Sequence, residues 1–156
     1  MSEIFINKLR ACSVTGHREL KNDLDETRLR EIFYKLIEGG FDTFLVGMAL
    51  GFDTLCFCIL EQIRKQKNIK IIACFPCETQ DYKFTLAQKE KYRKMLESAD
   101  EKVYISKGYT PYCMQKRNRF LVDNSSVLVA YLRNEKTGTS STVNYAKKQN
   151  VSVINI

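Results

Sequence analysis

The residues best suited to bind an anion lie near the N-terminus, in the stretch Thr15-Gly16-His17-Arg18. An apolar run ends at Gly16 and is followed by a histidine and an arginine, whose side chains can hydrogen-bond phosphate. A helical pattern begins near residue 24, so the stretch has the order strand, turn, helix, which directs backbone N–H groups and a helix dipole toward an anion. We expect Gly16, His17 and Arg18 to line a ligand site; for His17, purely structural hydrogen bonding is an equal alternative.

A second loop with the same character runs from Gly47 to Asp53 and reads Gly-Met-Ala-Leu-Gly-Phe-Asp. Gly47, Ala49 and Gly51 imitate the first part of a dinucleotide-binding fingerprint, but no third glycine follows at the required spacing. The glycines either let the main chain approach a ligand or only shape the turn. Asp53 is placed either to accept a hydrogen bond from a ribose hydroxyl or to cap the following helix.

Two later segments carry donors for a phosphate. Arg117 and Asn118 lie in the basic run 115–119, where a guanidinium could clamp a phosphate through two hydrogen bonds or face solvent. Gly138, Thr139 and Ser140 begin a helical pattern, so their hydroxyls and free N–H groups could hold an anion or only cap the helix.

The remaining reactive residues do not form a recognisable catalytic or metal site. Metal binding through histidine is not expected, because the chain has a single histidine. Cys74 and Cys77 have redox spacing but follow a strand with no helix start or partner cluster, so we assign no catalytic residue and no metal. The six cysteines accompany ample core-forming residues and no signal peptide, which favours a reducing, cytoplasmic location. No apolar run approaches the roughly 20 residues that cross a bilayer, so membrane insertion is not expected.

The segments that position these residues alternate between strand and helix patterns. Strands are expected at 10–15, 41–46, 69–75, 102–105, 127–132 and 151–154, and helices at 24–38, 53–66, 86–99, after the turn at 108–111 as far as 121, and at 139–149. Such alternation predicts a doubly wound α/β fold with three layers, α/β/α, around a mostly parallel sheet. With 156 residues the chain is long enough for one domain, 1–156, with its core at about 10–155.

The loops that follow parallel strands meet at one edge of the sheet, and ligands bind there where the strand order reverses. The segments 16–18, 47–53, 76–84 and 134–141 are therefore expected to converge. The 25 Lys and Arg residues against 18 Asp and Glu give a net charge of +7, which favours an anionic partner. Charge alone does not choose between a nucleotide and a nucleic acid.

As an ordered set, these motifs resemble the YpsA-like family of the SLOG superfamily, which also holds the Lonely-guy phosphoribohydrolases and the Smf/DprA proteins. The resemblance rests on Thr15-Gly16-His17-Arg18, Gly47 to Asp53, Phe75-Pro76 with Gln80, Arg117-Asn118 before Val122-Asp123-Asn124-Ser125, and Gly138-Thr139 before Thr142-Val143-Asn144-Tyr145-Ala146. It implies a Rossmann-like fold and a pocket for a nucleotide or nucleotide derivative. The residues it implies for ligand binding are Gly16, His17, Arg18, Gly47, Ala49, Gly51, Asp53, Arg117, Asn118, Gly138, Thr139 and Ser140.

The resemblance also bears on catalysis. Lonely-guy enzymes carry a glutamate for cleavage of an N-glycosidic bond, and Thr142 stands at the matching position of this chain. A hydroxyl does not replace a carboxylate in acid–base work near neutral pH, so the resemblance implies a cytoplasmic, nucleotide-binding sensor or regulator of bacterial type. The alternatives are a nucleotide N-glycosidase that uses Asp53 or Glu78, and a single-stranded nucleic-acid-binding protein. No cofactor other than a nucleotide is expected, and a homo-oligomer is left open.

Overall fold

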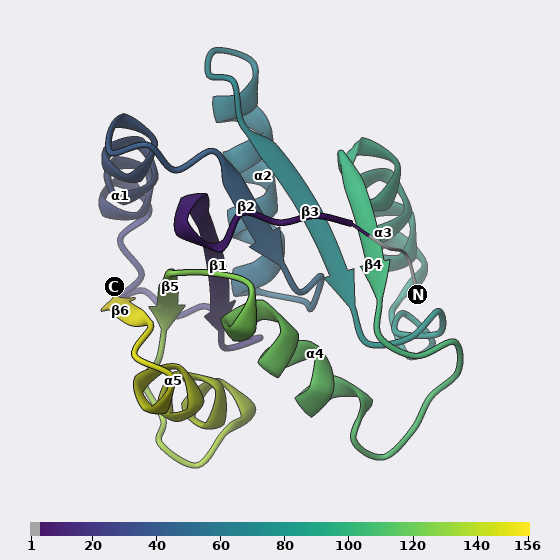
Figure 1. Cartoon of the computed structure of the whole chain (residues 1–156). Helices are drawn as coiled ribbons and strands as arrows, with labels where there is room; N and C mark the ends of the chain where they lie inside the picture. Colours follow the sequence, from purple (N-terminus) through teal and green to yellow (C-terminus); the bar gives the residue numbers. More distant parts are fainter. Residues whose placement is uncertain (1–3) are drawn as a thin grey trace.

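The protein is built around one sheet of parallel strands (Figure 1), seen here in a computed structural model that describes residues 4–156. The strands are β1 (Ala11–Gly16), β2 (Thr43–Val46), β3 (Lys70–Phe75), β4 (Glu101–Tyr104), β5 (Val127–Tyr131) and β6 (Ser152–Asn155), in the spatial order β4-β3-β2-β1-β5-β6. Every pair of neighbours is parallel, so the sheet of the described residues is entirely parallel rather than mostly so. This confirms the expected Rossmann-like α/β class.

Helices cover both faces of the sheet. They are α1 (Glu26–Glu38), α2 (Phe52–Arg64), α3 (Leu86–Ser98), α4 (Cys113–Asp123) and α5 (Gly138–Lys148), preceded by a short 3-10 turn, η1 (Lys8–Arg10). On one face, α1, α2 and α3 pack side chains such as Phe33, Phe57 and Met95 against the strands. On the other face, α4 contributes Leu121 and α5 contributes Val143 and Ala146. The three-layer arrangement follows from strands whose successive side chains point to opposite faces.

The helix starts have local causes. Asp25 accepts a hydrogen bond from the Arg28 N–H, so α1 begins two residues later than the expected start at residue 24. Thr85 and Gln88 form a reciprocal capping box at α3. At α5, the Thr137 side chain accepts a hydrogen bond from the Ser140 N–H at 3.2 Å, so this helix begins at Gly138, one residue earlier than expected.

The order of the strands reverses beside β1. From β1 the chain moves through β2 and β3 to β4 on one side, and it then returns to place β5 on the other side of β1. The connections that leave β1 and β5 therefore lead to helices on opposite faces of the sheet, α1 and α5, and open α/β sheets bind ligands at such a point.

The cysteines are free thiols in the core. Cys12, Cys56, Cys74, Cys77 and Cys113 are buried, and Cys58 is half-buried. Burial raises the pKa of the Cys12 and Cys74 thiols far above the ordinary range, so both stay protonated. Within residues 4–156, no helix has the length and apolar character needed to cross a bilayer.

Candidate functional site at the strand switch point

A cavity of about 360 Å³ lies where the strand order reverses, and we call it the switch-point cavity. Segments from β1, the start of α2, α4 and the start of α5 meet around it. Of the residues expected to bind a ligand, it is lined by Gly16, His17, Arg18, Ala49, Asp53, Arg117, Asn118, Gly138 and Thr139. The fold thus brings together side chains that are more than 120 residues apart in the sequence.

The three other expected residues lie beside this cavity rather than in its wall. A Cβ atom added to Gly47 would come within 3.0 Å of Asp53 Oδ2 and 3.1 Å of Arg117 Cζ, so the glycine leaves room for these side chains. At Gly51, where φ is 82°, an added Cβ would lie 2.1 Å from the Arg18 carbonyl oxygen. Ser140 belongs to the cap of α5 through its N–H group. Close packing of the chain against itself therefore requires both glycines.

Asp53 is buried, with 5% of its surface exposed, and only one of its carboxylate oxygens has a partner. Its Oδ2 atom accepts a hydrogen bond from the Ala49 N–H at 3.1 Å, whereas Oδ1 has no hydrogen-bond partner among the described residues. Burial raises the pKa of this carboxyl from 3.8 to about 6, against the opposing effects of Arg117, the Ala49 N–H and Arg18. Asp53 thus lines the cavity and keeps one buried acceptor unused among the described residues.

Arg117 is equally buried and is partly committed to the protein. Its Nε donates to Asn118 Oδ1 at 2.8 Å, and its Nη1 donates to the carbonyl oxygens of Gly47 and Cys74. These bonds fix the guanidinium between α4 and the ends of β2 and β3, and Nη2 takes no part in them. Burial lowers the pKa of Arg117, while the nearby Asp53 acts to raise it.

His17 connects two loops. Its Nε2 accepts hydrogen bonds from the N–H groups of Arg133 at 2.7 Å and Asn134 at 3.2 Å, in the loop that follows β5. Partial burial, followed by the charges of Lys21 and Arg133, lowers the pKa of His17. Because Nε2 accepts these two hydrogen bonds, it carries no proton in this arrangement, and that atom has a structural role.

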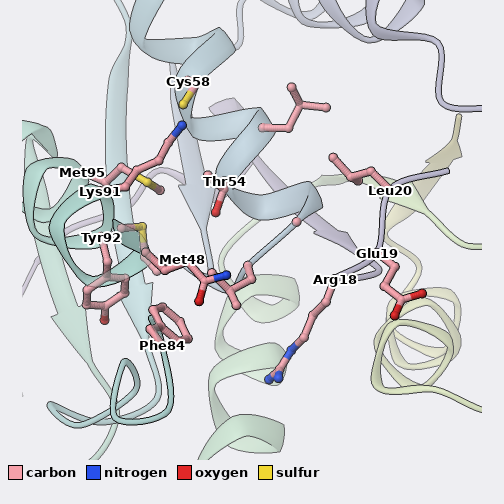
Figure 2. Close-up of a pocket in the computed structure, with 14 residues that line it drawn as sticks. Arg18, Glu19, Leu20, Met48, Thr54, Cys58, Phe84, Lys91, Tyr92 and Met95 are labelled. Atoms are coloured by element: carbon pink, nitrogen blue, oxygen red, sulfur yellow. The ribbon is translucent and has the colours of Figure 1, made fainter. Parts of the chain in front are cut away.

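Arg18 and the start of α5 supply donors that the protein itself leaves unused. The Arg18 side chain makes no ion pair with the described residues, and Figure 2 shows it extending away from Cys58 and Met95, toward α4. The N–H groups of Gly138 and Thr139 form no hydrogen bond within the described part of the chain, as is usual for the first turn of a helix. A Cβ atom added to Gly138 would meet nothing within 4 Å, so there is space beside this turn.

Five residues of the cavity wall were not among the expected ligand-binding residues: Val14, Thr15 and Thr137, which adjoin expected residues in the sequence, and Met114 and Leu121 of α4. Met114 and Leu121 stand three residues before and four residues after Arg117, so helical periodicity places all three on one face of α4, and that signal could have found them. Thr142, at the position of the Lonely-guy glutamate, does not line the cavity, and its hydroxyl donates to the Gly138 carbonyl at 2.9 Å. Within residues 4–156, no three His, Cys, Asp or Glu side chains group closely enough to hold a metal ion.

A different cavity, of about 620 Å³, lies between α2 and α3 (Figure 2). Its wall is mostly apolar and includes Met48, Leu55, Phe84 and Met95, and it shares Arg18 with the switch-point cavity. A phosphorylated ligand needs several convergent donors, so the smaller, more polar switch-point cavity is the better candidate site.

Comparisons with known proteins place this geometry in context. The family model described as the YspA SLOG family matches residues 14–154. The uncharacterized SPbeta prophage-derived protein YoqJ of Bacillus subtilis strain 168 is 35% identical over 118 residues, covering 67% of this chain and 69% of that protein. A UPF0398 protein of Listeria monocytogenes serotype 4a is 22% identical over 143 residues, covering 84% of this chain and 79% of that protein.

Two solved structures share the fold. DNA processing protein A of Streptococcus pneumoniae superposes with a TM-score of 0.69, and the Helicobacter pylori protein, described for its single-stranded DNA binding mode, with a TM-score of 0.63. Each is 17% identical and covers 94% of this chain, but the chain spans only 50% and 64% of their lengths. At this identity the likeness concerns the fold alone.

Proposed function

We propose that this chain, which belongs to the YspA SLOG family, binds a nucleotide or nucleotide derivative in the switch-point cavity and acts as a cytoplasmic sensor or regulator. The observation that carries the proposal is the Oδ1 atom of the buried Asp53, which has no hydrogen-bond partner within residues 4–156. A buried acceptor without a partner is unfavourable, and a ligand hydroxyl supplies the missing donor. Ribose presents such hydroxyls.

Donors for a phosphate surround the same cavity. The Arg18 guanidinium and the free N–H groups at the start of α5 supply positive charge and hydrogen bonds, and the α5 dipole adds to both. An acceptor for a hydroxyl and donors for an anion, in one cavity, match the two polar parts of a ribose phosphate. The expected ligand is therefore a phosphorylated nucleoside rather than a bare base or a bare nucleoside.

Calorimetric titration with AMP, ribose 5-phosphate and adenosine tests this proposal. We expect both phosphorylated compounds to bind more tightly than adenosine. Asp53→Asn should weaken the binding of AMP and of ribose 5-phosphate by about 1.5–3 kcal/mol, as when a hydrogen bond to a charged group is lost. The matched control is Arg28→Ala, which removes an exposed charge on α1 at a residue that does not line the cavity. Equal binding of all three compounds, or an unchanged affinity in Asp53→Asn, would contradict the proposal.

A second function is favoured by one observation, the raised pKa of Asp53. A buried carboxyl that titrates near pH 6 is suited to acid–base chemistry, so a nucleotide N-glycosidase that uses Asp53 is the rival. We favour binding without turnover, because Thr142 has no carboxylate and its hydroxyl donates a hydrogen bond to the Gly138 carbonyl.

Chromatography of nucleoside monophosphates incubated with the protein separates the two functions. We expect no free base with the natural sequence, and Thr142→Glu, which restores the Lonely-guy carboxylate, is the informative variant. General acid–base assistance contributes about 10²–10⁴-fold in rate, so rapid base release by the natural protein would establish the enzyme instead. Titration with a single-stranded oligonucleotide is a third arm, in which tight binding that falls steeply with salt would favour nucleic acid.

A further inference from the structure

A third cavity, of about 660 Å³, opens beside the switch-point cavity and has a different character. Its wall comes from the loops after β1, β2, β3 and β4 and from the first turn of α4. We call it the aromatic cavity, because its wall holds the rings of Tyr82, Phe84 and Tyr109. Its other lining residues are Arg18, Ala49, Leu50, Thr79, Gln80, Lys83 and Met114.

Two of these rings are exposed in a way that packing does not explain. Tyr82 is 78% exposed and Tyr109 is 70% exposed, so each keeps most of its surface in water. By contrast, Phe84 is held in place beneath them, because it packs edge-on against Tyr92 with ring centroids 5.6 Å apart. The aromatic cavity thus has a fixed inner ring and two outer rings with free faces.

The inner wall is also held by hydrogen bonds. The Gln80 side-chain amide donates to the Gly47 carbonyl at 3.2 Å, and its Oε1 accepts from the Tyr92 hydroxyl at 3.0 Å. The Gly47 carbonyl also accepts from Arg117 of the switch-point cavity. One carbonyl therefore couples the loop after β3 to the guanidinium beside Asp53, so the two cavities share a rigid partition.

The two cavities are adjacent, since Arg18, Ala49 and Met114 line both. A ligand whose phosphate and ribose occupy the switch-point cavity can extend past these residues without leaving the protein surface. The part that enters the aromatic cavity meets flat π-surfaces, an apolar floor and two cations, Arg18 and Lys83. Any nucleobase can stack on such surfaces, because every base has a planar π-face.

We propose that the aromatic cavity is the base-binding subsite of the ligand held in the switch-point cavity, with Tyr82 and Tyr109 stacking on the nucleobase. This inference rests on the proposed function and adds the residues that recognise the base. Arg18, a phosphate donor of the switch-point cavity, also lines the aromatic cavity. Because Tyr82 and Tyr109 lie on separate loops, after β3 and β4, base binding draws those loops together.

The test compares AMP with ribose 5-phosphate, which lacks the base. In the natural protein we expect AMP to bind roughly tenfold more tightly, within the range measured for one base stacked on aromatic rings. The double variant Tyr82→Ala/Tyr109→Ala should remove this difference and leave the affinity for ribose 5-phosphate unchanged. The corresponding Tyr→Phe double variant keeps both rings and should retain the difference.

Tyr112→Ala is the matched control. This tyrosine is 67% exposed and close in sequence to Tyr109, but it does not line the aromatic cavity, so the affinity for AMP should not change. The subsite is overturned if the Tyr82→Ala/Tyr109→Ala variant keeps its preference for AMP, or if it loses affinity for both compounds equally. Failure of ribose 5-phosphate to bind the natural protein, with AMP bound normally, would instead overturn the phosphate and ribose assignment of the switch-point cavity.

Discussion

Asp53 is an uncommon residue, because buried polar atoms in folded proteins usually have a hydrogen-bond partner. Its carboxylate is buried, and one of its oxygens has no hydrogen-bond partner in the part of the chain that the structure describes. Deprotonation of such a group is unfavourable, which is why its pKa rises to about 6. Near neutral pH the folded protein therefore holds a buried negative charge that a ligand hydroxyl can stabilise.

The first prediction concerns pH and Asp53→Asn. The folded state binds the Asp53 proton more tightly than the unfolded chain does, so this group favours folding below pH 3.8, and the benefit is lost as pH rises through about 6. Relative to the variant, the natural protein should lose about 2.4 kcal/mol of unfolding free energy between pH 4 and pH 7. Urea denaturation of both proteins at the two pH values measures this. If the unfolding free energies of the two proteins changed in parallel with pH, the pKa of Asp53 would not differ between the folded and unfolded states.

Arg18 and Arg117 differ in what they do for the protein, although both line the switch-point cavity. Arg117 holds the carbonyls of Gly47 and Cys74, whereas Arg18 forms no ion pair within the described residues. We expect Arg117→Ala to lower the unfolding free energy by about 3 kcal/mol, since charge-assisted hydrogen bonds in the interior are lost. Arg18→Ala should leave stability within about 0.5 kcal/mol and weaken phosphate binding only.

Thermal unfolding and titration of AMP against adenosine check both variants. A large loss of stability in Arg18→Ala would mean that this side chain has a structural role. If Arg18→Ala weakened the binding of adenosine as much as that of AMP, the phosphate would not be the partner of Arg18.

At the scale of elements, the start of α2 depends on the loop that precedes it. No side chain caps this helix, and its cap position is Gly51, whose φ of 82° favours glycine. Main-chain contact replaces the missing cap, because the Phe52 N–H donates to the His17 carbonyl at 3.1 Å. The loops after β1 and β2 are thus packed against each other through their backbones.

Gly51→Ala should therefore be strongly destabilising. The new Cβ would meet the Arg18 carbonyl oxygen at 2.1 Å in addition to the strain of a positive φ, so we expect a loss above the 1–3 kcal/mol typical of such strain alone. Gly40→Ala is the matched control, since its φ is 104° and its Cβ would meet nothing within 4 Å. Chemical denaturation of both variants measures the difference. Equal losses would indicate that the backbone contact at Arg18 relaxes freely.

Periodicity in the sequence predicts most of these elements, because each helix and strand buries one face of its own residues. The expected helix 86–99 and strand 69–75 differ from α3 and β3 by one residue at one end. Strand order is not predictable in this way, since β1 pairs with β5 through partners such as Cys12 and Val127, far apart in the chain. Likewise, the spacing of Gly47 does not reveal that Asp53 and Arg117 fill the space beside it. The convergence of loops follows from general topology, but the atoms that remain unpartnered depend on tertiary packing.

At the scale of the whole molecule, a network of side chains fastens the two loops at the switch point. The Tyr131 hydroxyl and the Arg133 Nε both donate to Asp23, at 2.7 Å and 2.6 Å, and the Arg133 Nη2 donates to the Ile156 carbonyl at 2.8 Å. Together with His17, these contacts join the segment after β1 to the end of β5 and to the last strand. Ligand binding between the loops is thus expected to act on a framework that is already connected.

The buried thiols are sites where chemical labelling can report the opening of individual elements. Cys12 lies in β1, Cys74 in β3, Cys56 in α2 and Cys113 in α4, and a buried thiol reacts with a disulfide reagent only after its element opens. We expect Cys58 to be modified first under native conditions, and the other cysteines at rates set by local or global opening. Mass spectrometry of peptides from timed labelling would assign each rate. Rapid modification of Cys12 in the native protein would mean that the central strand opens independently, whereas slow, common rates would define one cooperative unit from β1 to α4.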